Sequence, residues 1–233
     1  MKSLMTIVVP CYNEEEVLPL FMEAIEPVRK ALNDGKYSAP DISFPPCDTE
    51  IIFIDDGSKD NTLNLLRSFN AQDLGVRYIS FSRNFGKEAG IYAGLKASKG
   101  DYVVLLDADL QHPVEYIPEM YALLTADFSD AGSRTVSFDS VAMYRADRKG
   151  EGRIRSFFSR RFYRLINRIS KIDLIDGATD YRMMTRQMVD AVLSMQEYNR
   201  FTKGIFNWVG FNTRWLPYQN VERRAGSSKW SFS

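Results

Sequence analysis

Short apolar runs of strand length recur along the first half of the chain, and each ends abruptly in polar residues. They predict strands at residues 4–9, 51–54, 76–81 and 102–106. Between these runs, apolar residues recur at helical spacing and predict helices from Glu14 through Ile25, at 62–69 and over Lys87–Ala97. Alternating strands and helices are typical of an α/β protein with a Rossmann-like, mostly parallel central sheet and helices on both faces.

The remaining segments have weaker patterns. Residues 33–50 are rich in proline, aspartate, serine and glycine, which predicts a long surface loop. In the second half the pattern predicts a strand end at 131–134, a charged loop at 145–152, a helix at 181–193 and a strand-like segment at 206–216. The 233 residues are enough for one large α/β domain with a sizeable core, or for two small ones.

Composition narrows the possible partners and the compartment. The 30 basic and 30 acidic residues cancel, so the overall charge predicts no nucleic acid partner. Two cysteines, Cys11 and Cys47, are too few for a disulfide framework and are typical of a reducing compartment. No apolar stretch is long enough to cross a bilayer and no signal peptide is evident, so the chain as given is expected to be soluble and cytosolic.

Polar side chains with complementary chemistry follow the predicted strands. Asp107 and Asp109 follow the fourth strand, and Asp55 and Asp56 follow the second. The carboxyl ends of parallel strands meet at one edge, where open α/β sheets bind ligands. Other polar residues expected at this edge are Tyr12, Glu14, Arg83 and Lys87. A nucleoside diphosphate requires an aromatic face, carboxylates, cations and a metal-binding pair. Each carboxylate could instead be a solvated turn residue or a helix cap, and neither a Walker loop nor a GxGxxG loop is present.

A basic and aromatic segment follows in the second half. Five apolar residues recur there at helical spacing, arginines fill much of the rest, and no acidic residue occurs from 153 to 172. This composition predicts an amphipathic helix at about 153–170 that lies at a membrane interface. Anionic lipid would attract each nearby basic residue by about 1 kcal/mol. An ordinary core-facing helix with a solvated arginine face is the alternative.

Several motifs resemble those of family 2 glycosyltransferases with the GT-A fold. These motifs are residues 8–14 (VVPCYNE), 54–62 (IDDGSKDNT) and 107–113 (DADLQHP). Three more stretches resemble the polyprenyl-phosphate glycosyltransferases, a group that includes dolichol-phosphate mannosyltransferase and bactoprenol glucosyltransferases. They are residues 82–87 (SRNFGK), 177–186 (GATDYRMMTR) and 223–230 (RRAGSSKW). The resemblance spans nearly the whole chain, with the motifs in the same order.

The resemblance implies a donor site with a metal ion. It implies that Asp109 and Gln111 hold Mg²⁺ or Mn²⁺, with Asp107 near the ribose, the sugar or the metal. It places the following residues around the nucleotide sugar: Pro10, Tyr12, Glu14, Asp55, Asp56, Lys87, Asp107, Ala108, Asp109, Arg182, Arg224 and Lys229. A UDP-sugar is favoured over a GDP-sugar. The single histidine, His112, lies beside the implied metal and is expected to be structural, because Pro113 and a helix start follow it.

The resemblance also implies the acceptor. A hexose would pass, with inversion, from the nucleotide sugar to a polyprenyl phosphate, undecaprenyl phosphate being favoured, at the cytoplasmic face of the membrane. The residues expected at the acceptor phosphate are Arg134, Arg155, Ser159 and Arg182. Residues 1–135 would form the nucleotide-binding half, and residues 136–233 the acceptor-binding half, of one catalytic domain. The family's C-terminal membrane helices are expected to be missing from the chain. The resemblance is also compatible with a homo-oligomer.

The resemblance places Asp180 near the reaction centre, so the expected catalytic residues are Asp180, Asp107 and Asp109. In the family this aspartate is often assigned as the base. A phosphate monoester, however, has a second pKa near 6 and is mostly ionised at neutral pH, so it hardly needs a base. We therefore expect Asp180 to orient the acceptor or to control its electrostatics. Capping of the helix predicted at 181–193 is the structural alternative.

Three other functions fit parts of the pattern. A nucleotidylyltransferase would have a glycine-rich triphosphate loop near the N-terminus, whereas the first strand here ends in PCYNE. A family 2 transferase that acts on a saccharide acceptor in polysaccharide synthesis would not need the arginine-rich aromatic helix. A phospho-receiver domain would also place aspartates at strand ends, but it would leave the second half of the chain unexplained.

Overall fold

A central sheet organises the protein, and the computed structural model describes residues 2–38, 41–72, 74–126, 128–129, 135–146, 177–195, 197 and 200–219. The sheet has seven strands in the order β11-β9-β10-β6-β1-β4-β5. Their bounds are β1 Ser3–Cys11, β4 Cys47–Asp55, β5 Val76–Ser80, β6 Tyr102–Leu105, β9 Ser140–Arg145, β10 Ala178–Thr185 and β11 Thr213–Tyr218. Among these strands β10 alone runs antiparallel to its neighbours. The sheet is therefore mostly parallel, as the sequence predicts.

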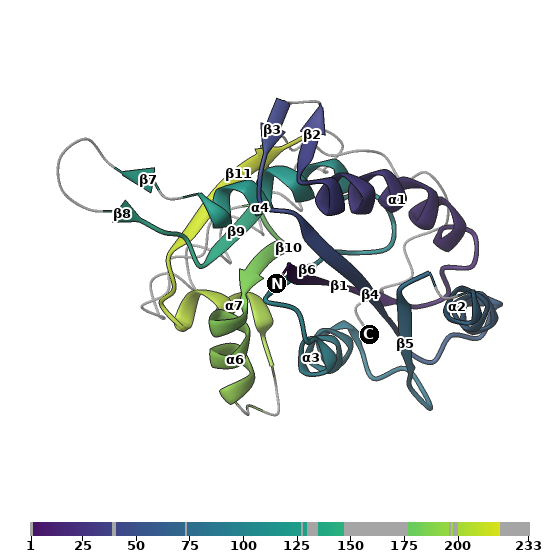
Figure 1. Cartoon of the computed structure of the whole chain (residues 1–233). Helices are drawn as coiled ribbons and strands as arrows, with labels where there is room; N and C mark the ends of the chain where they lie inside the picture. Colours follow the sequence, from purple (N-terminus) through teal and green to yellow (C-terminus); the bar gives the residue numbers. More distant parts are fainter. Residues whose placement is uncertain are drawn as a thin grey trace.

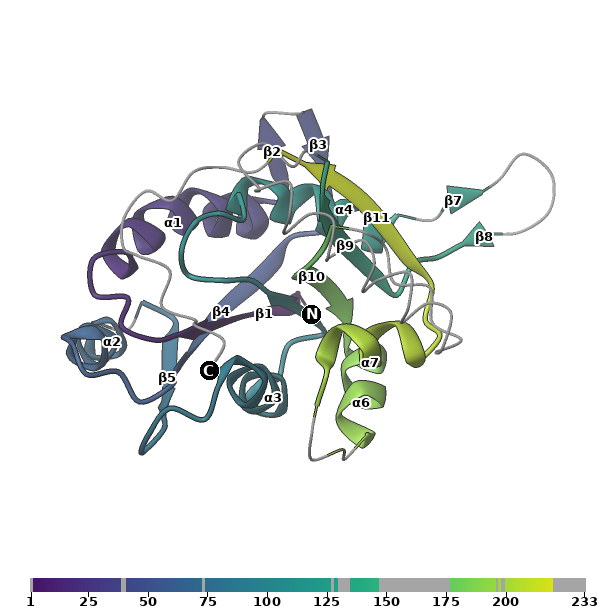
Figure 2. The ribbon, with the colours of Figure 1, turned by 180° about the vertical axis from the view of Figure 1, so that it is seen from behind.

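Helices cover both faces of this sheet (Figure 1). On one face lie α1 (Leu18–Asp34), the single turn η1 (Val114–Tyr116) and α4 (Ile117–Thr125). On the other lie α3 (Lys87–Ala97), α6 (Arg186–Ser194) and α7 (Thr202–Trp208), which are grouped together in the view from behind (Figure 2). Helix α2 (Thr62–Ala71) packs beside β5. Two small hairpins, β2–β3 (Lys36–Ser38, Asp41–Ser43) and β7–β8 (Phe128–Ser129, Thr135–Val136), lie outside the sheet.

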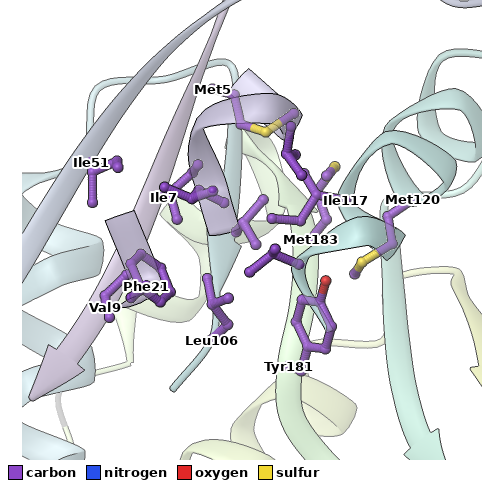
Figure 3. Close-up of a cluster of buried hydrophobic side chains, with 14 of the residues drawn as sticks. Met5, Ile7, Val9, Phe21, Ile51, Leu106, Ile117, Met120, Tyr181 and Met183 are labelled. Atoms are coloured by element: carbon purple, nitrogen blue, oxygen red, sulfur yellow. The ribbon is translucent and has the colours of Figure 1, made fainter. Parts of the chain in front are cut away.

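The core is split by the sheet because side chains alternate between the two faces of each strand. Met5, Ile7 and Val9 of β1 point toward Phe21 of α1 in one cluster of buried side chains (Figure 3). Val8 points the other way and joins a second cluster, formed with α3, α6 and α7. Each fully buried aliphatic or aromatic side chain contributes roughly 1.5–3 kcal/mol of transfer free energy. The strands are thus apolar on both faces, which explains their unbroken apolar runs.

The prediction of a long loop at 33–50 is wrong. Helix α1 continues to Asp34 and ends at Gly35, whose φ of 73° lets its N–H reach the last carbonyls of the helix. The chain then forms the β2–β3 hairpin and enters β4 at Cys47, which pairs with Ser3 of β1. Turn-forming residues in this stretch are compatible with short strands because tertiary pairing outweighs their weak local preference.

The predictions for the second half are corrected in two places. Residues 181–185 belong to strand β10 and the helix begins at Arg186, with the hydroxyl of Thr185 accepting from the amide of Met188. Residues 206–208 are the end of α7, and β11 begins at Thr213. Strand β10 is buried on both faces, so its sequence lacks the polar alternation that marks a half-exposed strand. The predicted strand end at 131–134 lies outside the described residues.

Strands from both predicted halves of the chain belong to the same sheet. The assignment of nucleotide binding to residues 1–135 and acceptor binding to 136–233 stays a prediction. Within the described part of the chain, no helix combines the length and the apolar composition that crossing a membrane requires.

Candidate functional site

The strand ends that carry the acidic motifs meet at one edge of the sheet. Cys11 at the end of β1 pairs with Asp55 at the end of β4, and Val8 of β1 pairs with Leu105 at the end of β6. Because β10 runs antiparallel to β6, its amino end reaches this same edge, with Arg182 opposite Leu105. The topology therefore brings Asp180 next to the segment that follows β6, although the two are far apart in sequence.

A cleft opens at this edge. The described residues that line it are Pro10, Cys11, Tyr12, Glu14, Lys87, Asp107, Ala108 and Asp109. Seven of these eight were predicted from the sequence to surround a nucleotide sugar, and the structure brings them together around one hollow. Cys11 was not predicted to belong to the site, because a cysteine within an apolar run carries no separate signal. Burial is the main cause that raises the pKa of the Cys11 thiol, and nearby carboxylates raise it further. The thiol therefore stays protonated as part of the wall of the cleft.

The turn after β6 holds Leu110 in a strained backbone conformation between Asp109 and Gln111. Leu110 has a φ of 57°, a region that bulky side chains rarely adopt, and its side chain is held in the core. Asp109 is buried, and its Oδ1 accepts a hydrogen bond from the amide of Gln111 at 3.1 Å. Strained residues of this kind concentrate at functional sites, where the surrounding packing maintains them.

Lys87 joins two carboxylates from distant parts of the chain. Its Nζ lies 2.7 Å from Oδ1 and 2.9 Å from Oδ2 of Asp107, and 2.8 Å from Oδ2 of Asp180. Burial disfavours the ammonium, but the two carboxylates outweigh burial and raise the pKa of Lys87 above its ordinary value. Burial by itself would raise the pKa of Asp180, but Lys87, Lys203 and Arg182 lower it to about 2. All three groups of the bridge are therefore charged at neutral pH.

Arg182 lies in the interior beside this bridge. It is 1% exposed, and its guanidinium stacks on the ring of Phe206 at 3.9 Å, with Trp215 at 5.8 Å. Burial lowers the pKa of Arg182 to about 10, although Asp180 opposes this shift. Nε and Nη1 of Arg182 and Oδ1 of Asp180 have no hydrogen-bond partner among the described residues. Sequence analysis did not predict the aromatic support of Arg182, because Phe206 and Trp215 come from separate, later elements.

Asp55 and Asp56 are occupied by hydrogen bonds from their own chain. Asp55 accepts from the amide of Ser58 at 2.9 Å and from the hydroxyl of Ser80 at 2.8 Å. Asp56 accepts from the amides of Phe85 at 2.7 Å and Gly86 at 2.9 Å. The repulsion between adjacent carboxylates is thus offset by donors of the protein, and both side chains lie beneath the loops rather than among the residues that line the cleft.

His112 has surroundings that suit a structural residue. Its ring stacks on that of Tyr181 at 5.2 Å, and its Nδ1 lies 3.4 Å from the amide of Asp107. Burial lowers the pKa of His112, although Asp107 opposes the shift, so the imidazole is neutral at physiological pH.

Several predicted residues lie outside the described part of the chain. They are Arg134, Arg155, Ser159, Arg224 and Lys229, together with the predicted amphipathic helix at about 153–170.

The donor set of the cleft fits a divalent ion that is shared with a diphosphate. Within the described ranges, no group of three or more histidine, cysteine, aspartate or glutamate side chains could hold a metal alone. Asp109 nevertheless presents hard oxygen donors to the cleft, and Gln111, which is not among the lining residues, follows on the same turn. Mg²⁺ is characteristically bound through one or two carboxylates, with water and substrate phosphates as its other ligands. These residues therefore fit a metal that arrives with a nucleotide better than a permanently enclosed one.

A mostly parallel sheet with acidic strand ends around a cleft, and one antiparallel strand bringing a further carboxylate to that edge, defines the GT-A class of fold. Two solved structures agree with this. The mannosyltransferase PcManGT from Pyrobaculum calidifontis, in complex with GDP-Man and Mn²⁺, aligns with a TM-score of 0.56 and 16% identity over 98% of this chain and 59% of that one. Glucosyl-3-phosphoglycerate synthase from Mycobacterium tuberculosis, in complex with Mn²⁺, UDP and phosphoglyceric acid, aligns with a TM-score of 0.56 and 18% identity over 97% and 72%.

The family follows from sequence comparison. A model of the family described as "Glycosyl transferase family 2" matches residues 6–193, so the chain belongs to glycosyl transferase family 2. A Bacillus subtilis (strain 168) protein named "Putative glycosyltransferase CsbB" is 40% identical over 100% of this chain and 63% of its own length. The bactoprenol glucosyl transferase of Shigella phage SfV is 36% identical over 97% of this chain and 66% of its own. The chain thus spans just under two thirds of the length of these relatives.

Proposed function

We propose that the chain transfers a hexose from a nucleotide sugar to a polyprenyl phosphate, with inversion, at the cytoplasmic face of the membrane. The observation that carries the proposal is the Lys87 bridge, which sets a buried, ionised Asp180 beside the acidic turn of the cleft. Asp107 lies on the cleft side of the bridge, where the nucleotide would bind, and Asp180 lies near Arg182, which would meet the acceptor phosphate. The bactoprenol name of several relatives favours undecaprenyl phosphate as the acceptor.

The donor would lie in the cleft, with its base and ribose near Pro10, Tyr12 and Glu14. Asp109 and Gln111 would hold Mg²⁺ or Mn²⁺, which when bound neutralises the diphosphate and makes it a better leaving group. A UDP-sugar remains the favoured donor over a GDP-sugar. Asp55 and Asp56 would shape the base pocket through the loops that they hold, and Arg224 and Lys229 would contact the diphosphate.

The acceptor would react without a protein base. One of its phosphate oxygens forms a bond to the anomeric carbon while the bond from that carbon to the diphosphate oxygen breaks, and the nucleoside diphosphate leaves. No proton has to move, because the acceptor phosphate is already largely ionised at neutral pH. Asp180, with its pKa lowered to about 2, is a poor proton acceptor. Its role would be to orient the acceptor and Arg182. Arg134, Arg155 and Ser159 would lie near the acceptor phosphate, and the helix predicted at about 153–170 would turn its basic face toward anionic lipid.

Replacing Asp180 with Asn tests this role. We expect kcat to fall by roughly tenfold to a hundredfold through lost positioning, with a pH–rate profile of unchanged shape. The measurement is kcat against pH, with and without added carboxylate or imidazole buffers. Rescue of the variant by such proton acceptors at high pH would show that Asp180 is a base and would contradict the positioning role.

The function itself is tested by acceptor competition. The chain, with Mn²⁺ or Mg²⁺ and a radiolabelled UDP-hexose, is given undecaprenyl phosphate in detergent or liposomes, and label in the organic phase is measured. We expect lipid-linked sugar that disappears with EDTA, and unchanged transfer by the control variant Asp190→Asn, which alters an exposed acid on α6. Label transferred only to an added saccharide would support the alternative, a family 2 transferase of polysaccharide synthesis.

A further inference from the structure

The first turn of α3 contacts two remote parts of the protein at once. Lys87, its first residue, bridges Asp107 and Asp180. Glu88, the next residue, reaches in another direction: its Oε2 accepts from the amide of Thr202 at 3.0 Å and also from the hydroxyl of Thr202. Thr202 is 114 positions away in sequence and begins α7. One helix turn is therefore tied both to the reaction-centre aspartates and to a remote helix.

Helix α7 depends on this contact for its cap. Its N-cap residue is Phe201, which makes no side-chain capping hydrogen bond and has no polar atom with which to make one. The carboxylate of Glu88 takes that place by accepting from the first helical amide, and its negative charge suits the positive end of the helix dipole. Because α7 has only seven residues, its position relies on such tertiary contacts more than on helix propensity.

Helix α7 in turn supports Arg182. The ring of Phe206, one turn into α7, lies 3.9 Å from the centre of the guanidinium, and both side chains are 1% exposed. Arg182 has no side-chain hydrogen bond from Nε or Nη1 to any described residue, so its placement depends on the aromatic face beneath it and on nearby Asp180. A shift of α7 would therefore move the guanidinium.

The start of α3 is itself tied to the loop that follows β4. Asp56, directly after β4, accepts from the amides of Phe85 and Gly86, which precede α3. Gly57 packs so closely on this loop that an added Cβ would lie 2.5 Å from the carbonyl carbon of Arg83. Hydrogen bonds and close packing thus join the loop that follows β4 to the loop that leads into α3 and Glu88.

We propose that Glu88 is a positioning residue: by capping α7 it holds Phe206, and through Phe206 the guanidinium of Arg182, in register with the Lys87 bridge. The kinetic part of this inference rests on the proposed transfer to a polyprenyl phosphate. Neither Glu88 nor Arg182 is among the described residues that line the cleft, so loss of Glu88 should weaken the acceptor side and leave nucleotide binding intact.

The test compares Glu88→Ala, Glu88→Gln and Thr202→Val with a matched control, Glu119→Gln, which alters an acidic residue in the first turn of α4. We expect Glu88→Ala to raise KM for undecaprenyl phosphate roughly fivefold to tenfold, about the size of a lost cap. The Kd of UDP with Mn²⁺, measured by calorimetry, should change less than twofold. Glu88→Gln, which keeps one acceptor oxygen, should recover part of the loss. Thr202→Val removes the hydroxyl contact but keeps the amide that Glu88 caps, so in a double-mutant cycle Glu88→Ala should cost less in this background than in the wild type, without becoming neutral.

A structural readout separates this inference from the proposed function. In Glu88→Ala, hydrogen exchange of the amides of α7 and of β10 around Arg182 should accelerate, while exchange in α4 and β4 stays as in the wild type. If the wild-type chain transfers no sugar to the lipid, the proposed function fails, and this exchange pattern still decides whether Glu88 holds α7 and Arg182. Unchanged exchange in α7 would overturn the inference. So would faster exchange with an unchanged KM for the lipid, or an equal loss of nucleotide and lipid binding.

Discussion

Lys87 is the most informative residue of the site to replace, because one ammonium neutralises the buried Asp180 and the partly exposed Asp107. Its side chain is 27% exposed, while those of Asp107 and Asp180 are 30% and 11% exposed. Replacing Lys87 with Met keeps most of the side-chain volume and removes the charge. Both carboxylates would then face each other at the same edge with their shared cation gone, and we expect the folded state to be destabilised.

The magnitude follows from the pKa of Asp180, which the folded protein lowers from 3.8 to about 2. At about 1.4 kcal/mol per pKa unit, this shift corresponds to about 2 kcal/mol of stability. Because the folded pKa is depressed, this stability is present above the ordinary pKa and is lost as pH falls through about 2. Removing one partner of a buried ion pair typically costs about 3–5 kcal/mol, since the remaining charge is left uncompensated. Lys87 and Asp107 are partly exposed, so the loss should fall below this range, and we predict about 2–3 kcal/mol near neutral pH.

The pH dependence of this loss distinguishes the electrostatic account from simple mispacking. In Lys87→Met, burial and mutual repulsion raise the pKa of the two carboxylates, so the variant recovers stability when they become protonated. The difference from wild type should shrink by about 1–2 kcal/mol between about pH 7.5 and about pH 4.5. Urea unfolding at both pH values measures this. Lys87→Arg, which keeps the charge, should show the wild-type pH dependence.

Lys96→Met is a matched control, because Lys96 lies in the last turn of the same helix and is exposed. It should lose less than about 0.5 kcal/mol at either pH, as is usual for surface substitutions. A loss in Lys87→Met that is equal at both pH values would refute the reasoning, because packing, unlike charge, does not titrate. Wild-type stability in Lys87→Met at neutral pH would refute it as well.

Three further variants test the parts that surround this bridge. Asp109→Ala should weaken UDP binding in Mn²⁺ at least tenfold and leave metal-free binding unchanged, by calorimetry; equal affinity in Mn²⁺ would remove Asp109 from the metal site. Gly57→Ala should lose about 1–3 kcal/mol in urea unfolding, because φ is 68° and the new Cβ would clash with Arg83; unchanged stability would show that the loop yields. Asp56→Asn should lose about 1–3 kcal/mol, because one amide of the loop before α3 loses its acceptor; full stability would show that this loop is held by other contacts.

The first half of the fold could be predicted because its signals are local. Each βα unit buries its own apolar strand and covers it with the next helix, so periodicity alone places the elements. The predicted helix Lys87–Ala97 has the same bounds in the structure. The predictions failed where pairing is remote: the chain from Cys47 onward is a strand because β1 lies beside it, and β10 reads as a helix until its two neighbours are known.

The sequence by itself determined which residues collect at the strand ends, because parallel strands place their carboxyl ends at one edge. Tyr12, Glu14, Lys87, Asp107 and Asp109 meet there as predicted. Only the tertiary structure decided what these groups contact. The antiparallel course of β10 sets Asp180 against Lys87, and the position of α7 places an aromatic ring under Arg182. These contacts join Lys87 to a residue 93 positions away and Arg182 to one 24 positions away, and no local spacing in the sequence encodes them.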